Sequence, residues 1–141
     1  MPTPSGLIST ARWGARGAAI FCLLFAAVQV ALALGAPYGE MAWGGSSPVL
    51  PAGLRAASAG AAVYLLAAAA AMLARSGDWG RRWPQALLRG FNGLLTLQLV
   101  LNTVGNLAAR DAGERSVMAA ASAVGALFCL LALIPRTLRS A

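Results

Sequence analysis

Four long apolar blocks constrain the fold of this 141-residue chain more than any other feature. A transmembrane helix needs about 20 apolar residues, because it crosses about 30 Å of hydrocarbon. No block has a charged residue between its ends, and none alternates in the way that barrel strands do. The blocks are therefore predicted to be membrane-spanning helices, at residues 17–36, 56–74, 90–109 and 116–135.

These spans predict an all-α fold: a single transmembrane domain, built as an antiparallel, up-and-down four-helix bundle over residues 1–141. The connections are a loop at 37–55, a second loop at 75–89 and a short turn at 110–115. Pro84 suits the first turn of a helix, so the third helix is expected to begin there and run along the interface before Gly90. Asp111 and Glu114 have the spacing of a capping box for the fourth helix.

The charges predict the orientation of the bundle. Eight Arg and one acid, Asp78, fall on the side of the termini and give it a net charge of +7, whereas three Arg and three acids cancel on the other side. Positively charged loops stay in the cytoplasm, so both termini are predicted to lie inside. The inner Arg are Arg12, Arg16, Arg75, Arg81, Arg82, Arg89, Arg136 and Arg139.

Interfacial aromatic residues agree with this orientation. Tyr and Trp favour the headgroup level, and three Trp fall at the predicted inner interface, while Tyr38 and Trp43 fall at the outer one. The expected partners of the Arg-rich inner face are anionic lipid headgroups. Nucleic acid is not expected, because no soluble basic domain exists to bind it. The three inner Trp are Trp13, Trp79 and Trp83.

The first span has an alternative interpretation. Arg12 and Arg16 precede an apolar stretch that contains Ala31-Leu32-Ala33, which is similar to a signal-peptidase site. A signal peptide has an apolar core of about 7–15 residues, and this stretch is longer. We therefore expect a retained helix; cleavage would leave three spans and an outer N-terminus.

The third span is unusually polar. At about 100° per residue, its polar side chains fall within an arc of about 160°, and Leu and Val fill the opposite arc. Gln29 of the first span lies level with Asn102, and Tyr64 of the second with Gln98. Two interpretations are open: hydrogen bonding between helices, which we favour, or a polar pathway or ligand pocket. The polar side chains are Asn92, Thr96, Gln98, Asn102, Thr103 and Asn106.

The outer loop is too apolar to be a plain spacer. Residues 36–51 hold three Pro, three Gly, Tyr38, Met41 and Trp43, with Glu40 as the single charge. Rigid turns with aromatic side chains predict a folded segment. It is expected to be an interfacial anchor or, alternatively, a lid over an outward pocket in which Glu40 is the charged group.

Reactive side chains are scarce. There is no His and no Lys, which excludes a Ser-His-Asp triad, a His-containing zinc site and Schiff-base chemistry. No catalytic residue, metal site or cofactor is predicted, and the chain is not expected to be an enzyme. Cys22 and Cys129 are interpreted as small buried residues. Gly60 and Gly125 predict close helix packing, in the bundle or against a second copy or a partner membrane protein.

The outer loop also carries a resemblance. Leu34-Gly-Ala-Pro-Tyr-Gly-Glu-Met-Ala-Trp-Gly-Gly45, Val49-Leu-Pro51 and Leu54-Arg55 resemble a pattern in small uncharacterised four-helix bacterial membrane proteins, and residues 106–115 are similar to the same group. The resemblance covers most of the chain. It implies four spans in a prokaryotic inner (plasma) membrane and no particular activity.

Three functions follow from these features, in order of preference. The first is a non-catalytic scaffold, accessory subunit or regulator, because reactive residues are lacking. The second is transport or binding of a small polar solute or a lipid through the amide-lined interior, with Gln29, Tyr64, Gln98, Asn102, Asn106 and Glu40 as candidate site residues. The third is a membrane enzyme that would depend on loop acids or a Tyr.

Overall fold

The computed structural model describes residues 4–43, 47–79, 83–108, 112 and 114–134, and these contain helices and no strand. The four main helices are α1 (Pro4–Ala33), α2 (Ala52–Ser76), α3 (Gln85–Leu107) and α4 (Ala119–Leu133). A short 3-10 helix, η1 (Gly39–Met41), interrupts the first loop, and a π-helical turn, η2 (Glu114–Met118), leads into α4. The all-α fold class is thereby confirmed.

Three of the helices are long and apolar enough to cross a membrane: α1, α2 and the continuous segment Arg115–Leu133. The helix α3 has 23 residues but is not among them. Its amides, hydroxyls and glycines lower its mean hydropathy, although its length would suffice. The structure therefore supports three apolar spans where the sequence predicted four.

The helix bounds differ from the predicted spans. The helix α1 begins at Pro4, not at residue 17, and α2 begins at Ala52, so the first loop ends at residue 51, four residues earlier than predicted. The helix α3 begins directly after Pro84, as predicted, and continues through Gly90 without a break. The proposed cap residue Asp111 lies outside the described residues, as do Arg110 and four of the inner Arg: Arg81, Arg82, Arg136 and Arg139.

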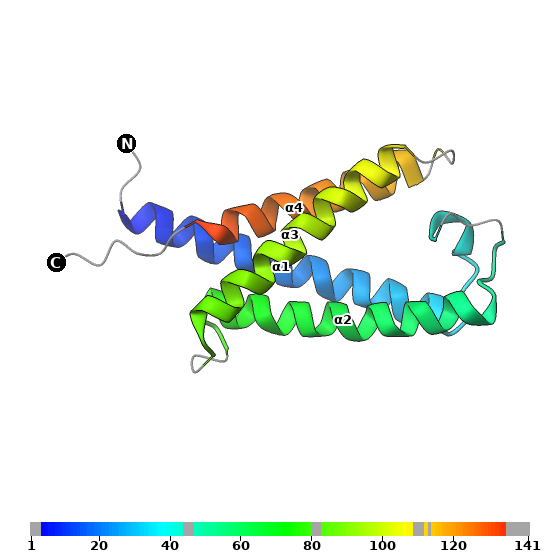
Figure 1. The fold of residues 1–141 in the computed structure, drawn as a ribbon, viewed down its shortest axis with the longest axis horizontal. Helices are drawn as coiled ribbons and strands as arrows, with labels where there is room; N and C mark the ends of the chain where they lie inside the picture. The colour runs from blue at the N-terminus through cyan, green and yellow to red at the C-terminus, as the bar shows by residue number, and fades with distance from the viewer. Residues whose placement is uncertain (1–3, 44–46, 80–82, 109–111, 113, 135–141) are drawn as a thin grey trace.

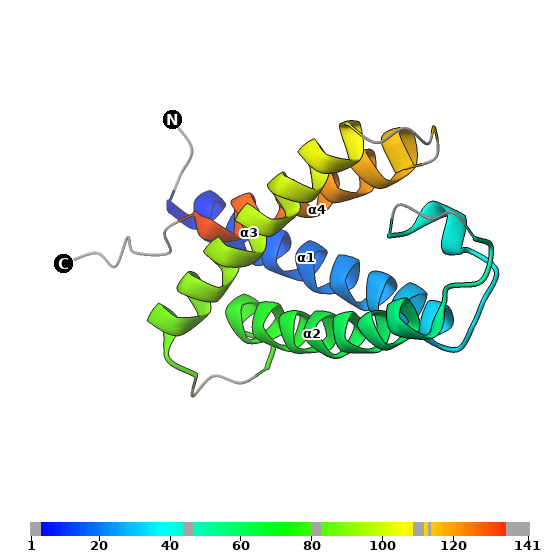
Figure 2. The same ribbon diagram turned by 45° about the vertical axis from the view of Figure 1, so that its right-hand side comes forward.

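The helices form two antiparallel pairs (Figures 1 and 2). One end of the molecule, here called the termini end, holds the start of α1, the end of α4 and the α2–α3 connection. The opposite end, called the loop end, holds the described residues of the first loop (34–43 and 47–51) and η2. The helix α1 packs extensively on α2 and on α4, and α3 packs on α4. The helices α2 and α3 contact each other much less, and they diverge toward the loop end.

Glycines bring α1 and α4 together. A Cβ added at Gly14 would lie 2.6 Å from the Leu131 Cβ and 2.7 Å from the Ala132 backbone nitrogen. The next contacts interlock, because the Phe128 ring of α4 covers Gly17 and the Phe21 ring of α1 covers Gly125. Small residues let membrane helices approach closely and gain dispersion energy, and the predicted packing role of Gly125 is confirmed.

A bidentate ion pair joins α1 to the turn after α2. The Arg16 Nε and Nη2 atoms donate to the two Asp78 carboxylate oxygens, each at 2.7 Å, and Arg12 lies 3.7 Å from the same carboxylate. The Ser76 hydroxyl is 2.8 Å from Asp78 Oδ2. The Arg16 guanidinium lies over the Trp13 ring, so aromatic and charged groups lie together at the termini end.

Two further Arg bind the ends of neighbouring helices. Arg75, which is only 1% exposed, donates from Nε at 2.7 Å and from Nη2 to the Ala132 carbonyl in the last turn of α4. Arg55 donates to the Ala33 carbonyl at the end of α1, at 2.9 Å. Both cations meet carbonyls that lack a helical partner, at the negative end of a helix dipole. Arg75 is therefore a buried cap at the end of α4. It was expected to be part of the charge that faces lipid headgroups, and this expectation was wrong.

We predict that Gly14→Ala destabilises the protein by about 1–3 kcal/mol, because the new methyl group must push α1 and α4 apart. Thermal unfolding in detergent measures this loss. The control is Gly90→Ala on α3, where nothing lies within 4 Å of an added Cβ. Equal behaviour of the two variants would contradict the close α1–α4 contact.

We predict that the Arg16–Asp78 pair makes stability depend on pH. The hydrogen bonds from Arg16, and then from Ser76, hold the pKa of Asp78 well below its ordinary value. A depressed pKa contributes stability that is fully present above about pH 4 and is lost as the pH falls further. The wild-type melting temperature should therefore fall in acid.

The Asp78→Asn variant should melt lower at neutral pH and lose less on acidification. Glu40→Gln is the matched control, since Glu40 is exposed and forms no ion pair with the described residues. A melting curve for Asp78→Asn with the same pH dependence as wild type argues against this role of the ion pair.

Candidate functional site

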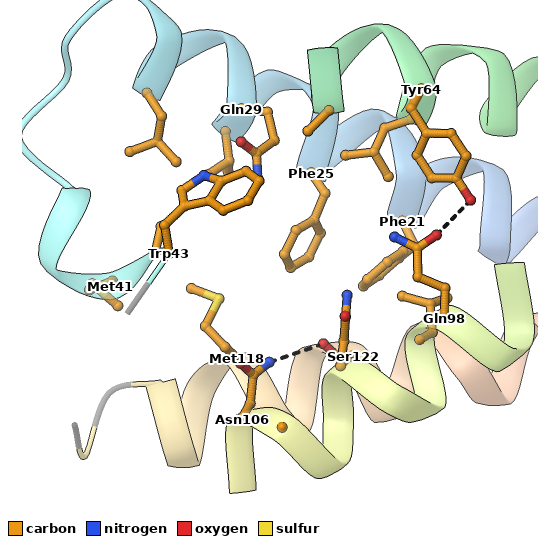
Figure 3. Close-up of a pocket in the computed structure, with 18 of the residues that line it drawn as sticks. Phe21, Phe25, Gln29, Met41, Trp43, Tyr64, Gln98, Asn106, Met118 and Ser122 are labelled. Carbon is orange, nitrogen blue, oxygen red and sulfur yellow. Dashed lines mark hydrogen bonds between the residues drawn. The ribbon is translucent and has the colours of Figure 1, made fainter. Parts of the chain in front are cut away.

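A cavity of about 470 Å³ lies between the two helix pairs, toward the loop end (Figure 3). Its walls come from all four helices, from η2 and from the first loop. This volume falls within the range of about 300–1,000 Å³ that is typical of small-molecule sites. The cavity exists because α1 and α4 touch at their glycines near the termini end, whereas Phe25 and Met118 stand between the helices farther along.

The cavity brings together five of the six candidate site residues from the sequence: Gln29, Tyr64, Gln98, Asn102 and Asn106. The sixth, Glu40, does not line it; its exposed side chain lies on η1. The loop instead contributes the next three residues, Met41, Ala42 and Trp43. The expectation that Glu40 is the charged group of a pocket therefore does not match the geometry.

The amides lie at different depths. Gln29 is four residues from the end of α1 and Asn102 five from the end of α3, so both lie within about 8 Å of the loop end of their helices. Tyr64 and Gln98 lie deeper. Gln29 and Asn102 were predicted to lie level, and both are near the loop end. The helix α1 is longer than the predicted span at the termini end and ends three residues earlier than predicted, at Ala33.

Part of the polar arc of α3 serves packing. The Asn92 amide is fully buried and donates to the Cys129 carbonyl of α4 at 3.1 Å. Thr96 and Thr103 donate to carbonyls one turn earlier on their own helix. The opposite arc is exposed, as predicted, at Leu94, Leu97, Val100, Leu101, Val104 and Leu107.

The remaining polar groups face the cavity. Tyr64 donates to Gln98 Oε1 at 2.7 Å and so links α2 to α3, which confirms that these two residues lie level. Asn106 Nδ2 lies 3.5 Å from the Ser122 hydroxyl on α4, the long limit of a hydrogen bond. Gln29 Oε1 is buried without a hydrogen-bond partner, and Asn102 makes no hydrogen bond to the described residues.

The first loop folds back over the cavity. The Trp43 indole donates to the hydroxyl of Ser58, a fully buried residue on α2, at 3.0 Å. At the base of the loop the Gly39 amide donates to the Pro48 carbonyl at 2.8 Å, and a Cβ at Gly39 would lie 2.5 Å from the Ser47 carbonyl oxygen. The prediction of a folded segment is confirmed over its described residues. Trp43 has a φ of 59°, a conformation that is uncommon for a bulky residue.

Several lining residues were not recognised in the sequence. Phe21, Phe25 and Met118 form the apolar wall, and nothing distinguishes them from other apolar residues in their spans. Ser58 is a polar residue of the second span, and because a buried hydroxyl needs a partner it hints at the bond to Trp43. The partner itself comes from a loop, whose path helical periodicity does not predict.

The cavity can hold an uncharged molecule by hydrogen bonds and apolar contact. None of its lining residues is charged. In the part of the chain that the structure describes, no three His, Cys, Asp or Glu side chains are grouped so that they could hold a metal ion. The available chemistry is amide and hydroxyl hydrogen bonding beside aromatic and aliphatic surface.

Comparison with protein-family models, with curated proteins and with solved structures finds no match for this chain.

We predict that two amide substitutions in the cavity lower the free energy of unfolding by different amounts. Gln98→Leu breaks the bond to Tyr64 and should cost on the order of 0.6 kcal/mol, the average for such bonds between membrane helices. Asn102→Leu should cost nothing, because its amide bonds no described residue. Thermal unfolding in detergent compares the two.

Tyr64→Phe is the partner control, since it removes the same bond from the other side. The double variant with Gln98→Leu should lose no more than either single variant loses. A cost for Asn102→Leu as large as that for Gln98→Leu would show that Asn102 also has a packing role.

Proposed function

We propose that this protein is a non-catalytic integral membrane protein that binds a small uncharged molecule in the cavity at its loop end. The observation that carries the proposal is a cavity without charged lining residues that is lined by two amides without hydrogen bonds to the described residues: Asn102, and Gln29, whose Oε1 is buried without a partner. A buried acceptor without a partner costs about 1–3 kcal/mol. A donor that reaches this oxygen would recover that free energy.

The proposal includes a placement in the membrane. The protein is proposed to lie in a prokaryotic plasma membrane as a four-span bundle, with the termini end in the cytoplasm. The Arg excess at that end supports this orientation, and the exposed Trp13, Trp79 and Trp83 suit the headgroup level. The helix α3 is proposed to cross as the fourth span, with its amides turned toward α4 and the cavity and its Leu and Val toward lipid.

Fewer Arg side chains are available to bind anionic lipid than the charge count of the termini end suggests. Arg12 and Arg89 are exposed and remain proposed contacts for headgroups. Arg16 is bound to Asp78 and Arg75 to Ala132, so these two cations are occupied within the molecule.

A second candidate is a scaffold or accessory subunit. The observation that favours it is a face of α2 on which exposed, mostly small residues lie beside Gly60, which has open space around it. Such a face suits close packing with a second copy or a partner membrane protein. The face comprises Ala56, Ala59, Gly60, Val63 and Ala67.

We predict that mild extraction from the native membrane retains a small molecule on the wild-type protein. Native mass spectrometry should show this added mass, and it should be reduced about tenfold in a Gln29→Leu, Asn102→Leu double variant that loses two ligand hydrogen bonds. Gln85→Leu, an exposed amide at the other end of α3, is the matched control.

The same spectra separate the two candidates. A bound mass that depends on Gln29 and Asn102 supports the binding function. No bound mass, together with a dimer or a partner chain that Gly60→Leu disrupts, would reject it in favour of the scaffold.

A further inference from the structure

We infer that the ligand of this cavity is a neutral amphiphile, with a head that carries hydroxyl or amide groups and with a hydrocarbon chain, taken up sideways from the membrane. This inference rests on the proposed binding function and specifies the ligand class. Four features carry it: the absence of charge, the unused amides, the apolar residues of the deeper part and the sparse contact between α2 and α3.

The charge of the ligand follows from the lining. Neither Glu40 nor Arg55, two charged residues at the loop end, lines the cavity, and Arg55 is bound to the Ala33 carbonyl. A charged group moved into such a site would lose its hydration without gaining a counter-ion, which is strongly unfavourable. An uncharged head avoids this cost.

The head is matched by the unused amides near the loop end. Gln29 Oε1 accepts and has no donor, and Asn102 provides both a donor and an acceptor. Tyr64 occupies Gln98 Oε1, so the Gln98 amide nitrogen still has hydrogens to donate. Hydroxyls and amides both donate and accept, and they satisfy this set.

The deeper part of the cavity is apolar. Phe21, Leu65, Leu95 and Leu99 surround the deeper Tyr64–Gln98 pair, whose polar atoms bond each other, and these apolar residues come from three different helices. A purely polar solute would leave this surface empty, whereas a chain would bury it at about 25 cal/mol per Å². The gradient from amides near the loop end to hydrocarbon below matches the gradient in one leaflet of a bilayer.

The route of the chain is the side of the bundle between α2 and α3. These helices contact each other less than the other neighbouring pairs do and diverge toward the loop end, beyond the Tyr64–Gln98 bridge (Figures 2 and 3). Gln98 and Asn102 are exposed on this side. Their chain neighbours Leu97 and Leu101 belong to the apolar arc, so these two amides lie next to the lipid-facing surface of α3. Amides next to lipid are unfavourable unless a polar group covers them, and the head of an amphiphile in the gap does so.

The test uses three probes on the full chain in phosphatidylcholine nanodiscs. These are 1-monooleoylglycerol, oleate with the same chain and a charged head, and glycerol with the head alone. Binding is measured by native mass spectrometry over a concentration series. The monoacylglycerol should bind at least tenfold more tightly than oleate, and glycerol should not bind.

Substitutions test whether the probe binds in the cavity. Gln29→Leu should weaken monoacylglycerol binding about three- to tenfold, as expected for one hydrogen bond, while Gln85→Leu changes nothing. Far-ultraviolet circular dichroism confirms that each variant is folded.

The outcomes separate the two levels of the claim. Equal or tighter binding of oleate, or binding of glycerol alone, that is still lost in Gln29→Leu overturns the neutral amphiphile and leaves the binding function standing. No binding of any probe, with no retained mass on the native protein, overturns both. Binding of the monoacylglycerol that Gln29→Leu does not weaken overturns the assignment of the head to this cavity.

Discussion

The architecture depends on the approach of α1 to α4 at three glycines. Gly14 brings the two backbones into contact, and Gly17 and Gly125 each receive a phenylalanine ring from the opposite helix. This contact lies in the half of the bundle toward the termini end. Farther along, Phe25 and Gln29 of α1 face Met118 of η2 and Ser122 of α4 across the cavity. Close packing at one end therefore creates the cavity at the other.

Unsatisfied backbone groups explain the positions of the Arg residues within this frame. In a membrane, helix ends that lack partners are costly, and α2 supplies an Arg near each of its ends. Arg55 binds the last carbonyl of α1, and Arg75 binds a carbonyl in the last turn of α4. The Arg16–Asp78 pair adds a third link at the termini end. The walls of the cavity are thus held by polar bonds outside it.

Periodicity predicted the large features because they repeat along the chain. The apolar blocks revealed four helices, Pro84 located the start of α3, and the exposed Leu and Val of α3 lie on the predicted arc. The grouping of Gln29, Tyr64, Gln98, Asn102 and Asn106 followed from counting residues along antiparallel helices. The prediction that Glu40 belongs to the pocket did not match the geometry, because a shift of one residue within η1 decides which loop side chains turn toward the cavity. The prediction for Arg75 was wrong because a charge at the end of a span was assumed to face the lipid headgroups, whereas Arg75 donates to a carbonyl of α4.

The central claim is that α3 presents its amides to a cavity open from the loop end and its leucines to lipid. Labelling of single introduced thiols with a small, membrane-impermeant methanethiosulfonate tests this directly, against the fully buried Cys22 and Cys129 as an unreactive background. The account predicts that the Asn102→Cys thiol reacts in right-side-out vesicles and not in inverted ones, while the Leu97→Cys thiol reacts in neither. Equal labelling of the two thiols, or labelling of Asn102→Cys only in inverted vesicles, would contradict the account.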